Sequence, residues 1–129
     1  MITDEELLKL AHIAAERAYA PYSKFEVGAC ALFESGKYYI GCNVENASFG
    51  LSLCAERNAI STAIAEGETS KLLKIAIVSK ETPMCFPCGA CRQWFSEFCS
   101  SDFQLMVEDK DKNPVYYSME NLLPNIFKL

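Results

Sequence analysis

The chain has 129 residues, half of them apolar and 22% charged, and its formal net charge is −5. This length can bury one adequate core but leaves no room for a second domain of ordinary size, so we expect a single domain over residues 1–129. No apolar run approaches the ~20 residues that cross a bilayer, and the first residues lack the features of a signal peptide, which predicts a cytoplasmic protein with no membrane role. Without a Lys/Arg cluster to neutralise phosphates, nucleic acid is disfavoured as a partner.

The N-terminal third of the chain predicts one helix followed by two strands. Thr3 and Glu6 fit a capping box, and the apolar residues after them recur at helical spacing as far as Ala18, with Pro21 marking the end of the helix. The segment 34–37 reads as a hairpin turn between two strands, and the polar stretch 43–48 reads as a loop. The two expected strands are Val27–Phe33 and Tyr38–Cys42.

The rest of the chain alternates helices and strands. Residues 54–66 are rich in Ala and Ile, with Gly67 just beyond, which predicts a buried helix with a glycine cap. An apolar strand is expected at 73–79, and two proline turns separate it from a helix at about 88–99. Strands near 104–108 and 115–117 and a short helix from Met119 complete the order. This order predicts an α/β fold, a three-layer α/β/α sandwich around a mixed five-stranded sheet.

Two short motifs carry the chemistry, and each lies where a helix is expected to begin. They are Cys54-Ala55-Glu56 and Pro87-Cys88-Gly89-Ala90-Cys91. A helix start lowers the pKa of a thiol and favours the thiolate that a metal requires. The spacing of Cys88 and Cys91 lets one helical turn offer both sulfurs to the same ion, and Cys54 can supply the third. Three ligands leave one coordination position open, as in a catalytic zinc site.

The other cysteines have plainer readings. Seven cysteines without a secretion signal favour free or metal-bound thiols over disulfides. Cys85 is the strongest competitor, because a fourth thiolate would close the zinc site and make the protein a structural-zinc binding module without hydrolytic activity. Pro87 turns the chain between Cys85 and the helix start, which disfavours that reading. Cys30, Cys42 and Cys99 are expected to be small buried side chains, and His12, the one histidine, is expected to be a packing or surface residue.

Taken together, the motifs resemble the zinc-dependent nucleoside deaminases, and in particular the small cytidine deaminases that form homotetramers. The similarity runs from the first helix to the C-terminal 122–124 segment. The stretches that carry it are Tyr19-Ala20-Pro21-Tyr22-Ser23-Lys24-Phe25, Val27-Gly28-Ala29, Asn43-Val44-Glu45-Asn46-Ala47-Ser48-Phe49, Cys54-Ala55-Glu56-Arg57 and Pro87-Cys88-Gly89-Ala90-Cys91.

This resemblance implies hydrolytic deamination of cytidine and deoxycytidine in pyrimidine salvage, with one Zn²⁺ per subunit. It implies zinc ligation by Cys54, Cys88 and Cys91 and an acid/base role for Glu56. The nucleoside contacts of the family fall on Asn43 and Glu45 for the ribose hydroxyls, Phe25 for stacking on the base, and the backbone around Ala55 for the pyrimidine carbonyl. Arg57 would offset the net charge of about −1 that three thiolates leave on a divalent ion by bonding to the ligand sulfurs.

Two positions depart from the family pattern or match it loosely. Phe49 stands where the family commonly has Tyr, so only an apolar contact is expected of it, and Phe127 corresponds to an aromatic residue that the family sends into a neighbouring subunit's site. Within the enzyme class, the alternative is an aminonucleoside antibiotic deaminase of the blasticidin S type, which shares the zinc motif. The loop sequence from Asn43 to Phe49 matches the cytidine pattern better.

Overall fold

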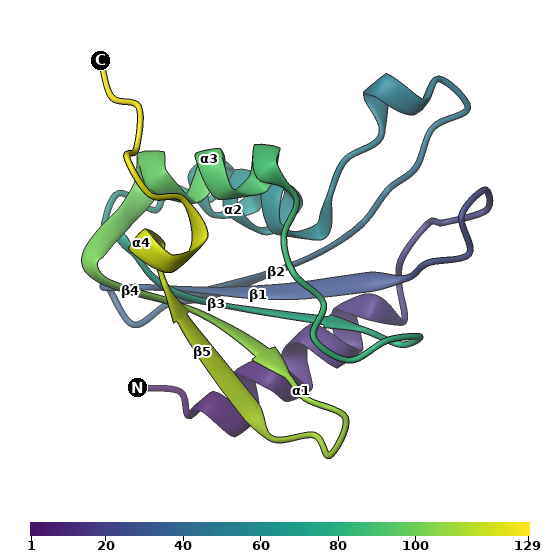
Figure 1. Ribbon diagram of the computed structural model, residues 1–129, viewed down its shortest axis with the longest axis horizontal. Coiled ribbons are helices and arrows are strands. Elements are labelled where there is room, and N and C mark those ends of the chain that lie inside the picture. Colours follow the sequence, from purple (N-terminus) through teal and green to yellow (C-terminus); the bar gives the residue numbers. More distant parts are fainter.

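The computed structural model describes residues 1–129 as a mixed five-stranded sheet with helices on both faces (Figure 1). This is the three-layer arrangement predicted from the order of elements. In chain order the elements are α1 (Asp4–Ala15), β1 (Val27–Phe33), β2 (Tyr38–Cys42), a 3₁₀ turn (Phe49–Leu51), α2 (Ala55–Ala65), β3 (Leu72–Ser79), α3 (Gly89–Phe98), β4 (Cys99–Glu108), β5 (Pro114–Ser118) and α4 (Met119–Leu122).

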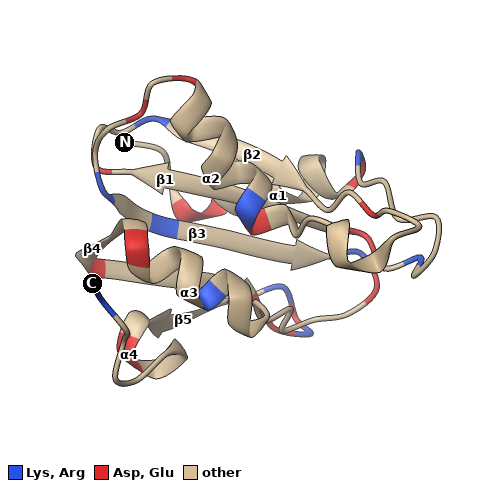
Figure 2. Cartoon of the chain, turned by 90° about the horizontal axis from the view of Figure 1, so that it is seen from above, with Lys and Arg blue, Asp and Glu red and all other residues tan.

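The strand order explains why α2 and α3 begin at the same edge of the sheet. The order is β2-β1-β3-β4-β5, with β1 antiparallel to both β2 and β3, so β2 and β3 run in the same direction, as does β4. Parallel connections are right-handed, and β2-α2-β3 and β3-α3-β4 both step the same way across the sheet. Both helices must therefore lie on one face with their N-termini at one end, and Figure 2 shows them side by side above the strands.

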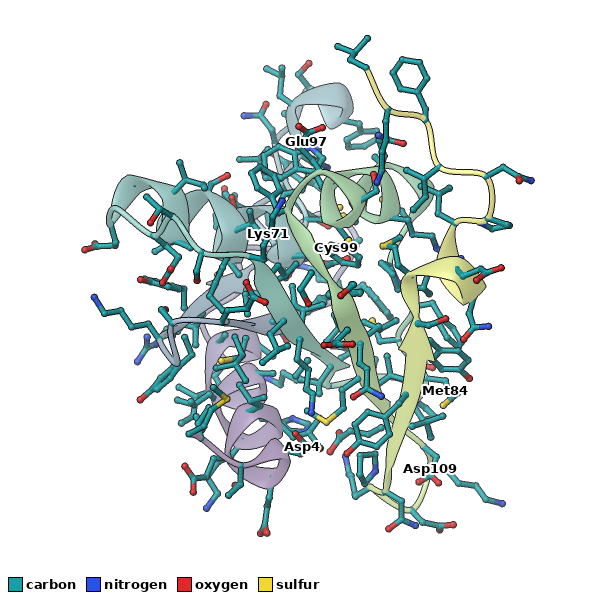
Figure 3. All side chains as sticks on the ribbon, turned by 90° about the vertical axis from the view of Figure 1, so that its left-hand side faces the viewer. Asp4, Lys71, Met84, Glu97, Cys99 and Asp109 are labelled. Atoms are coloured by element: carbon teal, nitrogen blue, oxygen red, sulfur yellow. The ribbon has the colours of Figure 1, made fainter.

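Two apolar clusters, one on each face of the sheet, form the core. The larger cluster of 19 buried residues joins α2, α3 and α4 to the sheet, with Ile60, Phe95 and Leu105 among its large side chains. The smaller cluster of 9 buried residues lies under α1 and includes Leu7 and Met106. Figure 3 shows side chains filling both layers, with Cys99 where α3 meets β4. The alternation of the strand side chains between two buried faces accounts for these two clusters.

Glycines let α1 and α2 approach the β1–β2 hairpin at backbone distance. A Cβ at Gly28 would lie 2.0 Å from the carbonyl oxygen of Ala11 in α1. A Cβ at Gly41 would lie 2.4 Å from the amide nitrogen of Ala59 in α2. Neither position can carry a side chain without moving a helix, so these two glycines fix how closely both helices pack.

The first helix is shorter than its apolar spacing predicted. The Thr3 hydroxyl caps it by accepting from the Glu6 N–H at 3.2 Å, as expected, but the helix ends at Ala15 and Ala18 lies outside it. The cause is a competing backbone pairing, in which the Tyr19 N–H donates to the Asn43 carbonyl at 3.0 Å. Periodicity in the sequence could not anticipate that non-local partner.

The strand β4 begins earlier than predicted, at Cys99 and not near residue 104. Cys99 pairs with Leu72, and after an irregularity the register resumes at Lys74 and Gln104. The intervening residues Ser100, Ser101 and Asp102 are polar and not β-branched, so their composition does not predict the first half of this strand. No helix of the structure is both long enough and apolar enough to cross a membrane.

Candidate functional site

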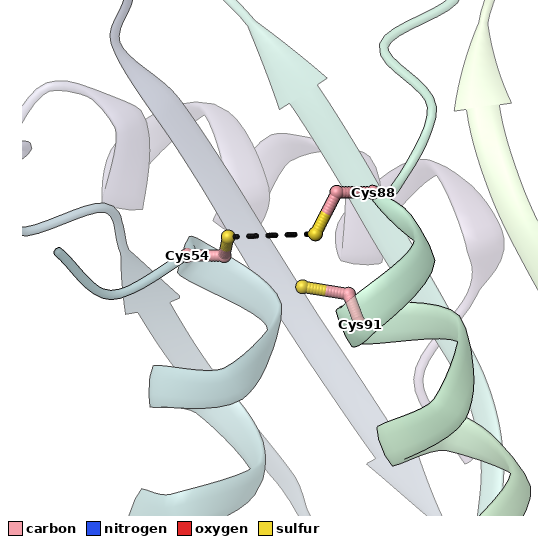
Figure 4. A group of neighbouring side chains, drawn as sticks. All are labelled: Cys54, Cys88 and Cys91. Carbon is pink, nitrogen blue, oxygen red and sulfur yellow. Dashed lines mark hydrogen bonds between the residues drawn. The ribbon is translucent and has the colours of Figure 1, made fainter. Parts of the chain in front are cut away.

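Three thiols from two helix starts meet at one point of the structure. The Sγ atoms of Cys54, Cys88 and Cys91 all lie within 4.8 Å of one another, with 3.9 Å between Cys54 and Cys88. Cys54 is the residue before α2, Cys88 is the residue before α3, and Cys91 lies in the first turn of α3 (Figure 4). The three sulfurs converge in that view, as a metal ion bound by all three requires.

Local electrostatics favour a negative charge in this cluster. A hydrogen bond from Cys91 and the nearby Arg57 guanidinium lower the pKa of Cys54 to about 5, despite partial burial. The same hydrogen bond, together with burial, raises the pKa of Cys91. The lowered pKa of Cys54 favours its thiolate form, which is the form that binds a metal.

Arg57 lies beside the cluster and supports the fit of a cation-binding thiolate site. Its Nη2 donates to the Cys54 sulfur at 3.3 Å, and its Nε is buried with no hydrogen-bond partner. A buried, unpartnered guanidinium nitrogen is costly unless negative charge lies close by. Three sulfurs around a divalent ion supply such a charge, so the residues present fit a zinc ion bound by three thiolates.

Glu56 is the buried carboxyl group of the site. Its side chain is 4% exposed, and burial, together with the negative charge of Cys54, raises its pKa to about 7. A hydrogen bond with the Cys91 side chain acts in the opposite direction and lowers the pKa of Glu56. A carboxyl group with a pKa near neutrality can both accept and release a proton, which is the property that general acid–base catalysis uses.

Cys85 does not join the three-thiol cluster. Its side chain is 8% exposed, and burial raises its pKa to about 12, so it is held as a neutral thiol. The cluster of mutually close ligand atoms holds Cys54, Cys88 and Cys91 alone. This geometry gives no support to a closed site with four thiolates. Cys30 is buried in β1, Cys42 lies in β2, and Cys99 begins β4, all away from the cluster.

The segment that holds Asn43 and Glu45 runs beside the start of α2. Val44 pairs with Leu53 through two backbone hydrogen bonds of 3.0 and 2.9 Å, and Leu53 directly precedes Cys54. Neighbouring paired chains lie about 5 Å apart. This pairing, which the loop prediction for residues 43–48 did not include, brings the segment from Asn43 to Glu45 beside the residue that precedes Cys54.

Hydrogen bonds from neighbouring loops hold both of these side chains in place. The Asn43 Oδ1 accepts from the Val27 N–H at 2.9 Å, and its Nδ2 donates to the Phe25 carbonyl at 2.8 Å. The Glu45 carboxylate accepts from the Ser23 hydroxyl and from two backbone N–H groups, those of Tyr22 at 3.0 Å and Ser23 at 3.1 Å. The Ser23 hydroxyl and these N–H groups lower the pKa of Glu45, which is therefore ionised at neutral pH.

Two aromatic residues line a cavity beside Glu45. A cavity of about 300 Å³ is lined by Tyr22, Ser23, Glu45, Phe49 and Ser52. Phe49 is 75% exposed and packs edge to face on Tyr22, with 6.1 Å between the ring centroids. The other two aromatic residues singled out in the sequence, Phe25 and Phe127, are also exposed. Ala55, the first residue of α2, is fully buried.

The sequence alone did not single out two residues that hold this region in place, Ser23 and Arg92. Ser23 fixes Glu45, yet a serine beside a proline turn carries no distinctive pattern of its own. Arg92 donates to the backbone carbonyls of Pro87, the first residue of the second motif, and of Leu122 in α4, and its position after Cys91 was the one signal available. His12, expected to be a packing or surface residue, lies outside the site and bonds to Glu108 at 2.7 Å.

An α/β/α sandwich that gathers three thiols at two neighbouring helix starts, with a buried carboxyl group beside them, has the architecture of a zinc-binding deaminase domain. Comparisons with known proteins agree with that class. Residues 1–107 match the family model described as the cytidine and deoxycytidylate deaminase zinc-binding region. The chain belongs to this family.

Relatives of known name cover nearly the whole chain. The cytidine deaminase of Halalkalibacterium halodurans is 40% identical over 121 residues, which are 94% of this chain and 91% of that protein. The cytidine deaminase of Sporosarcina psychrophila is 38% identical over 95% of this chain and 90% of its own length. The crystal structure of cytidine deaminase from Burkholderia pseudomallei superposes with a TM-score of 0.87 at 40% identity, covering 98% of this chain and 100% of that chain. The fold predicted from the sequence is thus confirmed at the level of the family.

Proposed function

We propose that the chain catalyses the zinc-dependent hydrolytic deamination of cytidine and deoxycytidine to uridine and deoxyuridine, with release of ammonia. The observation that carries this proposal is the convergence of Cys54, Cys88 and Cys91 beside the buried Glu56. Relatives named cytidine deaminase at about 40% identity over most of the chain support the choice of substrate.

The three cysteines would hold one zinc ion, and Arg57 would offset the negative charge of their sulfurs through its bond to Cys54. Zinc bound there supplies Lewis acidity to a hydrolytic reaction at neutral pH. The thiols lie at two helix N-termini, whose partial positive charge also stabilises the thiolate forms.

Glu56 would move the protons of the reaction. Hydrolysis forms a bond between C4 of the pyrimidine and the oxygen of water and breaks the bond between C4 and the amino nitrogen. The Glu56 carboxylate would accept a proton from the attacking water and pass it to N3 of the ring. It would then carry the second proton of that water from the hydroxyl group on C4 to the amino nitrogen, which leaves as ammonia while C4 becomes a carbonyl carbon. A carboxyl group whose pKa is about 7 exchanges protons in both directions at neutral pH.

Asn43 and Glu45 would hold the sugar. After their bonds within the chain, Asn43 retains one amide hydrogen and one acceptor position on its oxygen, and Glu45 retains one of about four acceptor positions. These free positions suit the hydroxyl groups of a sugar, which both accept and donate. Contacts to the 3′ hydroxyl, which ribose and deoxyribose share, would accommodate both sugars. Phe25 would stack on the base, and the backbone at Ala55 would bond to the pyrimidine carbonyl.

This assignment predicts the substrate range. Cytidine and deoxycytidine should have similar kcat/KM values, whereas free cytosine should fall by roughly 10⁴ because polar groups built for a sugar hydroxyl lose their partner. Cytidine monophosphate should also be poor, since the ionised Glu45 repels phosphate. Steady-state kinetics on the four compounds measure this directly.

A variant separates the sugar contact from the chemistry at the ring. Glu45→Gln should lower kcat/KM for cytidine while leaving the already low value for cytosine unchanged, because cytosine makes no contact with that side chain. Comparable rates of the wild-type protein on cytidine and on cytosine or the monophosphate would contradict the nucleoside assignment and leave the hydrolytic zinc chemistry standing.

The same proposal includes a single catalytic domain over residues 1–129 that assembles as a homotetramer with shared sites, in the cytoplasm, where thiols stay reduced. Support for assembly comes from apolar side chains that the isolated chain leaves exposed, including Phe49 at 75%, Phe127 at 68% and Leu51 at 66%. Light scattering should give the mass of four chains. A stable monomer with full activity would remove the tetramer and the role of Phe127 in a neighbouring site.

A further inference from the structure

Arg92 links the second motif to the C-terminal helix. Its Nε donates to the carbonyl oxygen of Pro87 at 3.0 Å, and its Nη1 donates to the carbonyl oxygen of Leu122 at 3.0 Å. Its backbone N–H also donates to the Cys88 carbonyl at 3.1 Å. One side chain thus spans from the residue before Cys88 to the last residue of α4.

The bond to Pro87 acts on the position of Cys88. The Pro87 carbonyl and the Cys88 nitrogen belong to one planar peptide group, so holding that oxygen orients the backbone from which the Cys88 side chain projects. Cys88 precedes α3 and makes no side-chain bond that caps the helix. The helix holds the Cys88 carbonyl through the Arg92 N–H, and the Arg92 side chain adds a restraint on the peptide group that precedes Cys88.

Of the three thiols, Cys88 is the one that needs such a restraint most. Cys91 is completely buried, and its position is set by packing. Cys54 is half-buried and bonded to Arg57. Cys88 is exposed, so few neighbouring atoms limit its movement.

The other end of the link is firmly anchored. Leu122 is 5% exposed and belongs to the larger core cluster, and α4 is closed at its start by a reciprocal capping box between Ser118 and Asn121. Arg92 forms no ion pair with a carboxylate, so its planar fork of donors is directed to the two carbonyls. The tether therefore joins the exposed Cys88 to an element that packs into the core.

We propose that Arg92 is a positioning residue that holds Cys88 in place for zinc by fastening Pro87 to α4. The proposal rests on the function proposed above, in which Cys88 is a zinc ligand. Arg92 does not touch zinc or substrate; it slows loss of the metal by keeping the exposed thiol in the geometry that the other two define.

The test measures how fast zinc leaves the purified holoenzyme in the presence of excess chromogenic chelator. Arg92→Met should release zinc about 10- to 100-fold faster than the wild-type protein, the range typical for loss of a residue that orients a metal ligand. Arg92→Lys should lie between them, because an ammonium group keeps the charge but cannot bond both carbonyls in a fork. Gln93→Met is the matched control, an exposed neighbour without a side-chain hydrogen bond to lose, and it should release zinc at the wild-type rate.

Each outcome decides a particular point. Zinc release from Arg92→Met at the wild-type rate would overturn the positioning role, as would equal acceleration in Gln93→Met. Should Arg92→Met fail to fold, Arg92→Lys decides alone, and an unchanged rate in that variant overturns the role. A wild-type protein that deaminates cytidine without bound zinc would instead defeat the proposed function on which this inference rests.

Discussion

Glu56→Gln should retain its zinc, and its kcat for cytidine should fall by a factor of at least about 10²–10⁴, the contribution typical of one general acid–base group. The loss should exceed that range if Glu56 serves all of the proton transfers at N3 and at the leaving nitrogen. Glutamine matches the shape of the side chain and carries no charge into a buried site, where Glu56 is 4% exposed, so the fold should tolerate it. Zinc content and kcat, measured on the same preparation, separate the two effects.

The matched control is Glu66→Gln, which makes the same chemical change at an exposed position next to the end of the same helix. It should keep both its zinc and its turnover. A Glu56→Gln protein with a full complement of zinc and near-normal turnover would end the assignment of Glu56 as the proton carrier, while leaving the metal site intact.

Cys88→Ser should lose zinc and activity together, from about one ion per chain to less than roughly a tenth after dialysis, because two thiolates and a neutral hydroxyl no longer hold the ion. Cys88 is exposed, so this variant should fold normally. Cys91→Ser should lose zinc as well but also buries a hydroxyl in the core, which costs about 1–3 kcal/mol if it finds no partner. Metal analysis of folded protein measures both.

Cys85→Ser provides the comparison, since Cys85 is also buried but lies outside the thiol cluster. It should lose some stability and keep its zinc and its turnover. Equal loss of zinc in the Cys85, Cys88 and Cys91 variants would instead point to a closed site of four thiolates and to a structural ion.

The sequence predicted the grouping of the three thiols better than it predicted the segments around them. Cys54 and Cys88 could be placed because each precedes a helix whose composition and cap are local properties, and Gly67 indeed adopts the positive φ of 91° that a glycine cap uses. Their convergence follows from the strand order β2-β1-β3-β4, which no local pattern contains.

Contacts between distant segments account for what was missed. The bridge between Val44 and Leu53 and the pairing of Tyr19 with Asn43 join short, irregular stretches without a strand pattern. The first helix was predicted too long for the same reason. The side chains of Asn43 and Glu45 are fixed by groups some twenty residues away, as in the bond from Ser23 to Glu45. Such bonds depend on the tertiary fold, and a single sequence gives no local signal for them.

The two glycines of the β1–β2 hairpin have a consequence for how sequences of this fold can diverge. Gly28 pairs with Cys42, and Ala29 pairs with Gly41, so the two glycines belong to adjacent residue pairs of the β1–β2 hairpin. Gly28 faces α1, and Gly41 faces α2 on the other side of the sheet. At these two positions the backbones of α1 and α2 lie directly against the two faces of the hairpin, with no side chain between them. The distance between the two helices is therefore set here by the dimensions of the peptide backbone. Apolar side chains elsewhere can be exchanged and repacked over generations, while the height at which α2 begins above the sheet, and with it the height of Cys54 and Glu56, stays constant.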